Sequence, residues 1–247
     1  MAPTGSGTKD KDMMFIFDVD DTMYDLMWPF RKAYEQILSG RTKTGCEKLF
    51  QRSRIYSDVI LQKEKQGLIR PEDAFYERMK MTCEEAGFSI SREECDAFER
   101  EYRYYQSRIK LYDFMRDILD YCREKGIPTA LLTNGNRRNQ GRKLSALQLE
   151  RWFEPDKMYI SGDLGYHKPD VRAFQKVQEC LRILPEEAWY IGDSYESDIV
   201  GAHSAGWHSI WLNHRERECP DSRSLADMEV RDGEELFCRM RDIWNNL

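Results

Sequence analysis

The sequence lacks the features of a membrane, secreted or nucleic-acid-binding protein. No apolar run approaches the roughly 20 residues that a helix needs to cross a bilayer. The first twelve residues, MAPTGSGTKDKD, have no apolar stretch of the kind found in secretory signals, and we expect residues 1–12 to form a flexible tail outside the fold. The net charge of -6 argues against a partner such as a nucleic acid polymer, whose phosphate backbone requires a basic surface.

Cysteine usage excludes a disulfide scaffold. The chain has seven cysteines, none in a CxxC spacing, and an odd number cannot pair completely. Reduced thiols are the rule in the cytosol. We therefore expect a cytoplasmic globular protein that has no membrane partner. No pattern in the sequence indicates an oligomeric state.

Acidic residues are concentrated in the stretch FIFDVDDTMYD. The apolar run Met13–Phe17 is typical of a strand buried on both faces, and it leads directly into Asp18, Asp20 and Asp21. Three carboxylates within four positions repel one another and would be costly at the end of a buried strand. A bound cation would relieve that repulsion, so the pattern predicts one.

The chain divides into two kinds of sequence. Residues 27–109 combine helix formers with apolar residues at helical spacing, and Ser91 followed by Glu94 predicts a capping box at a helix start. We expect residues 27–109 to form a helical domain. Residues 13–26 and 110–247 are expected to form one core domain.

Strands and helices alternate in the second half of the chain. We expect a helix over 113–125 that ends at Gly126, a strand within 127–135, a helix over 138–150, a strand within 157–163, a helix over 169–183 with Pro169 in its first turn, a strand within 188–193, a helix over 196–206 and a last strand over 208–213. This alternation predicts an α/β fold: a Rossmann-like parallel sheet with an inserted α-helical domain.

Polar residues follow four of the expected strands. They are Asp18, Asp20 and Thr22 after the first, Thr133 and Asn134 after the second, Lys168 in the region after the third, and Asp193 and Asp198 after the fourth. In open α/β sheets, ligands bind where the carboxyl ends of the strands meet. The four groups are therefore expected to converge on one site.

The residue types in these groups suit phosphate chemistry. Carboxylates of Asp18 and Asp193 are the ligands that Mg²⁺ prefers, and a neutralised carboxylate can attack phosphorus. Lys168 and the Thr133 hydroxyl would bind the phosphoryl oxygens. Asp20 is the candidate general acid for the leaving alkoxide, and would later deprotonate the attacking water.

The segments DVDDT, LLTN, HKP and GDSYESD, in this order, resemble the four motifs of the haloacid dehalogenase (HAD) superfamily of phosphohydrolases. The resemblance spans about residues 14–213, and the helical insertion is similar to that superfamily's type 1 cap. It implies Mg²⁺ as cofactor and a small phosphorylated metabolite as substrate. The commonest first motif has Gly where this chain has Asp21, a position expected to bind phosphate through its backbone N–H.

The resemblance also implies a role for each motif residue. Asp18 would be nucleophile and metal ligand, and Asp20 the acid/base and a ligand through its backbone carbonyl. Thr133, Asn134 and Lys168 would bind phosphate. Asp193 would bind the metal and Asp198 would lie in its outer shell, although an ordinary helix cap is an equal reading for Asp198 alone.

A finer resemblance concerns the substrate. The stretch GDSYESDIVGAHSAGWHSIWLNHRERE is similar to that of nucleoside 5'-monophosphatases, including pyrimidine nucleotidases, and N-acylneuraminate-9-phosphatases share much of it. A nucleoside 5'-monophosphate is therefore the expected substrate. A sugar phosphate phosphatase, a phosphomutase, a 2-haloacid dehalogenase and a non-catalytic binding protein remain alternatives.

Several polar residues are expected to have ordinary structural roles. The run RERE at 215–218 is predicted to be a solvated loop, His167 a loop residue and Arg70 a surface arginine. Tyr102, Tyr104 and Tyr105 are predicted to pack within a helix rather than to stack on a base.

Overall fold

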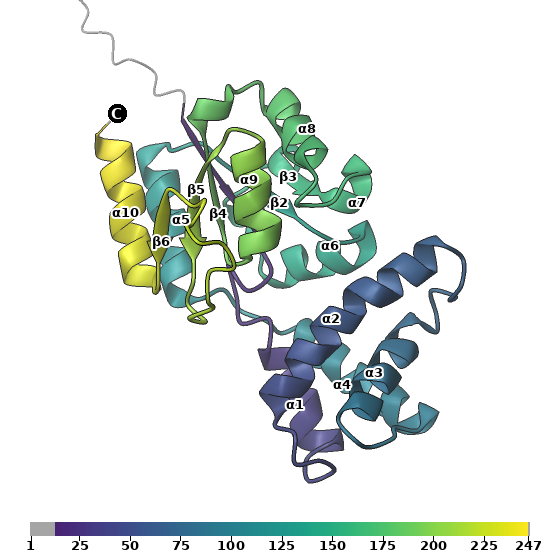
Figure 1. Ribbon diagram of the computed structural model, residues 1–247. Helices are drawn as coiled ribbons and strands as arrows, with labels where there is room; N and C mark the ends of the chain where they lie inside the picture. Colours follow the sequence, from purple (N-terminus) through teal and green to yellow (C-terminus); the bar gives the residue numbers. More distant parts are fainter. Residues whose placement is uncertain (1–12, 247) are drawn as a thin grey trace, which may run out of the picture. The chain divides into compact units, whose positions relative to one another are not determined.

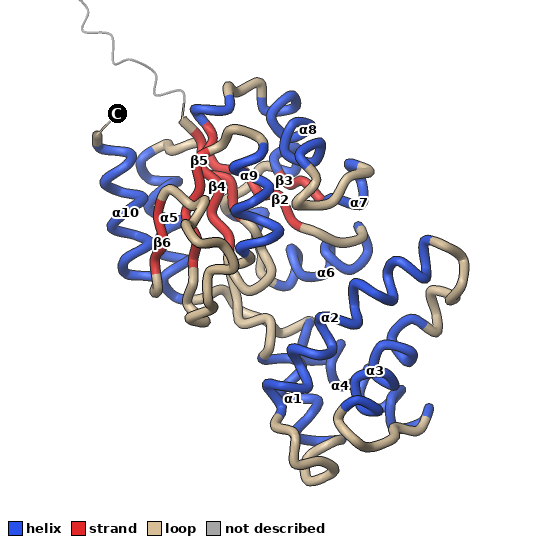
Figure 2. Tube along the Cα trace, viewed as in Figure 1, coloured by secondary structure: helices blue, strands red, loops and turns tan. Residues whose placement is uncertain are grey.

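A computed structural model describes residues 13–246 (Figures 1 and 2), so the tail predicted over residues 1–12 lies outside the described part. The chain forms two compact units. Residues 13–24 and 111–246 belong to the first, and Asp25–Lys110 forms the second. No helix among the described residues is both long enough and apolar enough to span a bilayer.

The first unit contains one parallel sheet. Its strands are β1 (Met14–Phe17), β2 (Thr129–Thr133), β3 (Met158–Ile160), β4 (Ala188–Gly192), β5 (His208–Leu212) and β6 (Met228–Val230). They lie in the order β3-β2-β1-β4-β5-β6, and every neighbouring pair is parallel. This confirms the predicted α/β fold. Because β1 lies between β2 and β4, the segments that leave these three strands are neighbours in space.

Helices cover both faces of this sheet. They are α5 (Asp113–Lys125), α6 (Arg137–Ala146), α7 (Ser161–Leu164), α8 (Val171–Leu181), α9 (Val200–Ser204) and α10 (Gly233–Asn245). Single helical turns occur at Leu149–Arg151, Pro155–Lys157, Pro185–Glu187 and, as a π-helical turn, Tyr195–Ile199. Figure 1 shows α5 and α10 on one side of the strands and α8 and α9 on the other.

The central strands β1, β2 and β4 are mostly apolar and buried because both faces of the sheet are covered. One core joins alternate residues of β1, β2 and β4 to α8 and α9: Met14, Ile16, Ala130, Leu132, Ala173, Phe174, Val177, Ala188, Tyr190, Ala202 and Trp207. Burial of this set, at about 25 cal/mol for each Å² of apolar surface, fixes the strands and so the positions of the loops that follow them.

The second unit is helical. It consists of α1 (Trp28–Ile37), α2 (Cys46–Lys65), α3 (Ala74–Glu85) and α4 (Arg92–Gln106), which are blue in Figure 2. Its core contains Phe30, Ala33, Leu38, Leu49, Met79, Cys83, Ile90, Cys95 and Phe98. The predicted capping box is confirmed: the Ser91 hydroxyl accepts from the Glu94 N–H at 3.2 Å, and the Glu94 carboxylate accepts from the Ser91 N–H at 2.9 Å.

Local signals located some elements correctly. Helix α5 covers Asp113–Lys125 as predicted, and Gly126 follows it with φ of +64°, the left-handed conformation that glycine adopts without steric cost. The strand predicted within 188–193 is β4.

Three predicted boundaries are wrong. The strand over 208–213 is not the last, because β6 and α10 follow it; β6 has only three residues, too few to show a period in the sequence. The helix expected over 138–150 ends at Ala146, and the chain then turns at Gln148, where φ is +54°. Pro169 lies outside α8, which begins at Val171 and is capped by the Asp170 carboxylate.

Candidate active site at the ends of the central strands

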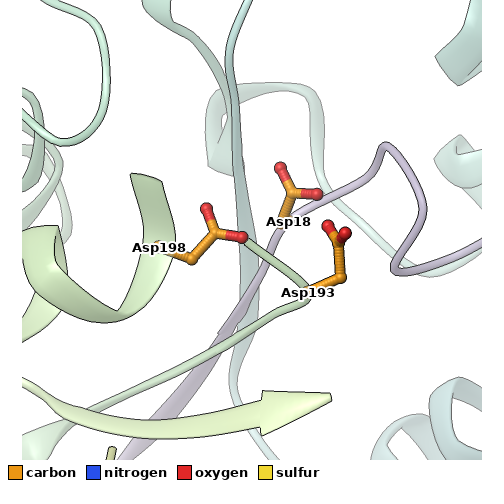
Figure 3. A group of neighbouring side chains, drawn as sticks. All are labelled: Asp18, Asp193 and Asp198. Carbon is orange, nitrogen blue, oxygen red and sulfur yellow. The ribbon is translucent and has the colours of Figure 1, made fainter. Parts of the chain in front are cut away.

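Three aspartates from three segments bring their carboxylates together (Figure 3). Asp18 follows β1, Asp193 follows β4, and Asp198 lies in the π-helical turn. One oxygen of each carboxylate lies within 4.8 Å of the other two, and all three residues are buried. We call this group the acidic cluster. The N-cap of this turn is Ser194 and not Asp198, whose Oδ2 accepts from the Ser194 N–H at 3.0 Å.

The Lys168 ammonium lies between two members of the acidic cluster. Its Nζ donates to Asp18 Oδ1 at 2.7 Å and to Asp198 Oδ1 at 2.6 Å, and it lies 2.6 Å from the Tyr190 hydroxyl oxygen. Tyr190 in turn donates its proton to the Leu132 carbonyl at 2.7 Å. Asp18 Oδ2 accepts from the Thr22 hydroxyl at 3.2 Å. Both oxygens of Asp18 are thus held, which leaves its carboxylate in a defined orientation.

Burial controls the protonation of the cluster. Burial raises the pKa of Asp18 to about 7; Lys168 opposes this rise, while Asp198 and Asp20 add to it. The pKa of Asp193 is raised well above its ordinary value by burial, by Asp198 and by Asp21. Burial alone would lower the pKa of Lys168, but the carboxylates of Asp18 and Asp198 reverse the effect and raise it. Lys168 is therefore charged, whereas ionised Asp18 and Asp193 are disfavoured.

The donor set of the acidic cluster fits a divalent metal ion. Three carboxylates meet one buried ammonium, so negative charge is in excess when all three are ionised. Oxygen-only donors of this kind suit a hard cation such as Mg²⁺. A bound dication would offset the burial penalty that raises the pKa values of Asp18 and Asp193.

The two residues predicted after β2 have different environments. Thr133 is fully buried, and its hydroxyl oxygen has no hydrogen-bond partner among the described residues. An unpartnered buried hydroxyl is costly, and a bound ligand would satisfy it. Asn134 instead holds the backbone of Lys168: its Oδ1 accepts from the Lys168 N–H and its Nδ2 donates to the Lys168 carbonyl, each at 2.9 Å. Phosphate binding by Asn134 stays a prediction.

Asp20 lies apart from the acidic cluster and is held by different residues. The Lys143 ammonium donates to Asp20 Oδ1 at 2.8 Å and Oδ2 at 2.5 Å. The Tyr24 hydroxyl donates to Oδ1 at 2.7 Å and the Gln140 amide to Oδ2 at 3.3 Å. Sequence reasoning missed Lys143 and Gln140. Helix α6 is polar nearly all round, so its sequence contains no local signal that distinguishes these two buried side chains from solvated ones.

The prediction of a solvated loop at 215–218 holds for the exposed Arg217, but it missed that both arginines contact buried carboxylates. Arg215 donates to both carboxylate oxygens of Asp21, at 2.7 and 2.6 Å. Arg217 lies 3.0 Å from Asp193 Oδ2 and 3.3 Å from Asp21 Oδ2. Asp21 has φ of +63°, and His214 Nε2 contacts its carbonyl at 2.8 Å. The run is polar, but the fold brings it beside two buried carboxylates that follow other strands.

Two minor predictions can be compared with the structure. Arg70 is an exposed arginine paired with Asp73 at 2.6 Å and Glu72 at 3.3 Å, as predicted for a surface residue. His167 lies in a loop, where its Nδ1 is 2.7 Å from the Ser161 hydroxyl.

Comparison with known proteins gives the family. The sequence profile described as "Hydrolase: haloacid dehalogenase-like hydrolase" matches residues 13–206. Phosphoserine phosphatase of Thermus thermophilus is 36% identical over 166 residues, which are 66% of this chain and 64% of that protein, slightly under two thirds of its length. Glyceraldehyde 3-phosphate phosphatase of Methanopyrus kandleri is 23% identical over 231 residues, 92% of this chain and 97% of that one.

Solved structures support the same fold. YfnB of Bacillus subtilis, bound to magnesium, has a TM-score of 0.68 at 22% identity, covering 92% of this chain and 98% of its own. L-2-haloacid dehalogenase of Xanthobacter autotrophicus, with chloropropionic acid covalently bound, has a TM-score of 0.69 at 18% identity, covering 92% of this chain and 98% of its own. At these identities the similarity concerns the fold alone. The profile match covers well over half of the chain, and the chain therefore belongs to the haloacid dehalogenase-like hydrolase family.

Proposed function

We propose that this protein is a Mg²⁺-dependent phosphatase that hydrolyses a small phosphomonoester through an aspartyl phosphate on Asp18. The observation that carries the proposal is the acidic cluster with Lys168 buried inside it. The Thr133 hydroxyl at the end of the neighbouring strand, which has no hydrogen-bond partner among residues 13–246, supports it. The names of similar proteins, which act on phosphoserine, glyceraldehyde 3-phosphate and phosphoglycolate, point to the same class of substrate.

The residues that would hold the metal are those of the acidic cluster. We assign Asp18 and Asp193 as carboxylate ligands, the Asp20 backbone carbonyl as a further ligand, and Asp198 as an outer-shell partner that fixes Lys168. When bound, Mg²⁺ would neutralise the nucleophile and the incoming phosphate, which otherwise repel each other.

The side chains of this chain supply the remaining chemistry. A carboxylate oxygen of Asp18 forms the new bond to phosphorus, while the bond from phosphorus to the leaving oxygen breaks. Asp20 gives that oxygen a proton. Asp20 then takes a proton from a water molecule, whose oxygen attacks phosphorus and releases inorganic phosphate and free Asp18. Lys168 and the Thr133 hydroxyl stabilise charge on the phosphoryl oxygens in both steps, with the backbone N–H of Asp21 as a further proposed donor.

The helical unit Asp25–Lys110 is inserted between β1 and α5, and we propose that it serves as the cap that selects the leaving group. For the substrate itself we retain the nucleoside 5'-monophosphate, which rests on the resemblance of residues 192–218. Short phosphorylated metabolites are the competing class, favoured by the names of the relatives.

A substrate screen tests the proposal. Purified protein would be incubated with Mg²⁺ and UMP, dUMP, dTMP, phosphoserine, phosphoglycolate, glyceraldehyde 3-phosphate and a phosphorylated sialic acid, with free phosphate as readout. We expect hydrolysis that EDTA abolishes and Mg²⁺ restores. Asp18→Asn should lose turnover, whereas Asp242→Asn, at an exposed position on α10, should keep it.

Several outcomes would reject the proposal or part of it. Normal hydrolysis by Asp18→Asn would remove the assigned nucleophile. Release of chloride from 2-chloropropionate without phosphatase activity would make the protein a dehalogenase. Transfer of the phosphoryl group to a sugar would make it a mutase. A clear preference for a short metabolite over all nucleotides would reject only the nucleotide assignment.

A further inference from the structure

Lys143 is a buried lysine without a place in the reaction described above. It lies on α6, only 7% exposed, and its ammonium contacts both oxygens of Asp20, at 2.8 and 2.5 Å. The two residues are 123 positions apart, so only the packing of α6 beside the segment after β1 brings them together. Lysine is seldom buried unless it is paired.

The pair is better explained by orientation than by stability. Removing two charges from water costs about as much as their attraction returns, so a buried ion pair is weak evidence for a stabilising role. Here the ammonium is joined by two further donors: the Tyr24 hydroxyl on Oδ1 and the Gln140 amide on Oδ2. Three donors from two segments fix the plane of one carboxylate, which is more than charge neutralisation requires.

The fixed orientation separates Asp20 from its neighbours. Asp20 is two residues from Asp18, yet the group of close carboxylates among the described residues contains Asp18, Asp193 and Asp198 and not Asp20. A carboxylate free to turn at this position would be drawn to any cation bound by that cluster.

We propose that Lys143 is a positioning residue that holds the Asp20 carboxylate away from the acidic cluster, so that it remains available for proton transfer. The proposal deepens the proposed function and rests on it for its kinetic part. The carboxylates then have two separate roles. The carboxylates of the acidic cluster bind the cation and provide the nucleophile, whereas the Asp20 carboxylate protonates the leaving oxygen and deprotonates the water. The Gln140 amide and the Tyr24 hydroxyl are the other two donors that hold this carboxylate.

The first test measures metal binding and does not depend on activity. Lys143→Met keeps the apolar stem and removes the charge, and Lys143→Gln keeps a donor. Lys157→Met, at a partly exposed lysine before β3, is the matched control. Calorimetric titration with Mn²⁺ should show roughly tenfold tighter binding to Lys143→Met, because the Asp20 carboxylate joins the two carboxylate ligands Asp18 and Asp193, and ligand charge tunes affinity. Lys157→Met should bind like the unchanged protein.

The second test separates the two chemical steps. With 4-nitrophenyl phosphate, whose leaving group needs little help from an acid, Lys143→Met should release about one equivalent of nitrophenolate quickly and then turn over roughly 100-fold more slowly, the typical size of general acid–base catalysis. With an alkyl phosphate, both chemical steps need Asp20, so no rapid release of the alcohol is expected. With the aryl phosphate KM should fall together with kcat, because the slow second step then limits turnover while the phosphate contacts are intact.

Unchanged Mn²⁺ affinity in both Lys143 variants would overturn the proposal, as would a loss of kcat that is equal for aryl and alkyl phosphates and shows no rapid phase. A Lys143→Met protein that fails to fold, beside a folded and fully active Lys143→Gln, would also overturn it. If the unchanged protein hydrolyses no phosphomonoester, the proposed function fails, and the Mn²⁺ titration still decides whether Lys143 separates Asp20 from the cluster.

Discussion

Replacing Asp18 by Asn should change how the stability of the metal-free protein depends on pH. Asp18 is 5% exposed, and burial raises its pKa from the ordinary 3.8 to about 7. Between these values the native state holds a proton that the unfolded chain has released. The free energy of unfolding therefore falls as pH rises from about 4, and the loss is complete above pH 7.

The size of the effect follows from the two pKa values. A difference of about three in pKa corresponds to about 4 kcal/mol in total, of which about 2–3 kcal/mol falls between pH 5 and pH 8. Asn has no proton to release, so Asp18→Asn should gain about 2–3 kcal/mol relative to the unchanged protein over this interval. The effect on Asp193 adds to this gain. Asp18 is one cause of the raised pKa of Asp193, and Asp18→Asn removes that cause.

Urea denaturation in EDTA at pH 5 and pH 8 measures this difference. Asp242→Asn serves as the control for loss of an exposed carboxylate and should track the unchanged protein. At pH 8, Mg²⁺ should raise the free energy of unfolding of the unchanged protein much more than that of Asp18→Asn. The ion offsets the cost of ionising the buried Asp18 carboxyl, and the variant has no such cost. A stability difference between Asp18→Asn and the unchanged protein that is constant from pH 5 to pH 8 would refute the reasoning.

Three further substitutions have defined outcomes. Thr133→Val removes a buried hydroxyl that has no partner in the described part of the chain, so the free energy of unfolding should stay equal or rise by about 1 kcal/mol while KM for a phosphomonoester rises; a clear loss of stability in denaturation would contradict this. Arg217→Ala removes the cation 3.0 Å from Asp193, so the Mg²⁺ concentration for half-maximal thermal stabilisation should fall about two- to fivefold, and an increase would show that Arg217 assists the metal. Gly201→Ala would place a methyl group 2.3 Å from the Phe174 ring, and should destabilise the protein by about 1–3 kcal/mol despite the higher helix propensity of Ala; an unchanged melting temperature would show that the ring can move.

The first strand and its aspartates show what can be predicted from local sequence. The run Met13–Phe17 is apolar because β1 is covered on both faces, and that requirement acts on each residue separately. The same holds for α5, which ends at a glycine in the left-handed conformation. The convergence of Asp18 and Asp193 followed from one rule of sheet topology, since residues after neighbouring parallel strands share an edge.

The partners of these aspartates could not be predicted in the same way. Lys143 and Arg217 lie in polar stretches, where a lysine or arginine that pairs with a buried carboxylate has the same local pattern as one that does not. Strand β6 was not predicted for a related reason. Its three residues are too few to show a period in the sequence, and its formation depends on pairing with β5.

The sequence by itself determined the order of the strands and helices from β1 to β5 and which segments end in carboxylates, because backbone preferences and burial periodicity act over a few neighbouring residues. The tertiary structure alone decided which cation faces which carboxylate: Lys168 for Asp18 and Asp198, Lys143 for Asp20, and the two arginines for Asp21 and Asp193. Electrostatic attraction depends on the distance between side chains in space, and that distance is set by how remote elements pack.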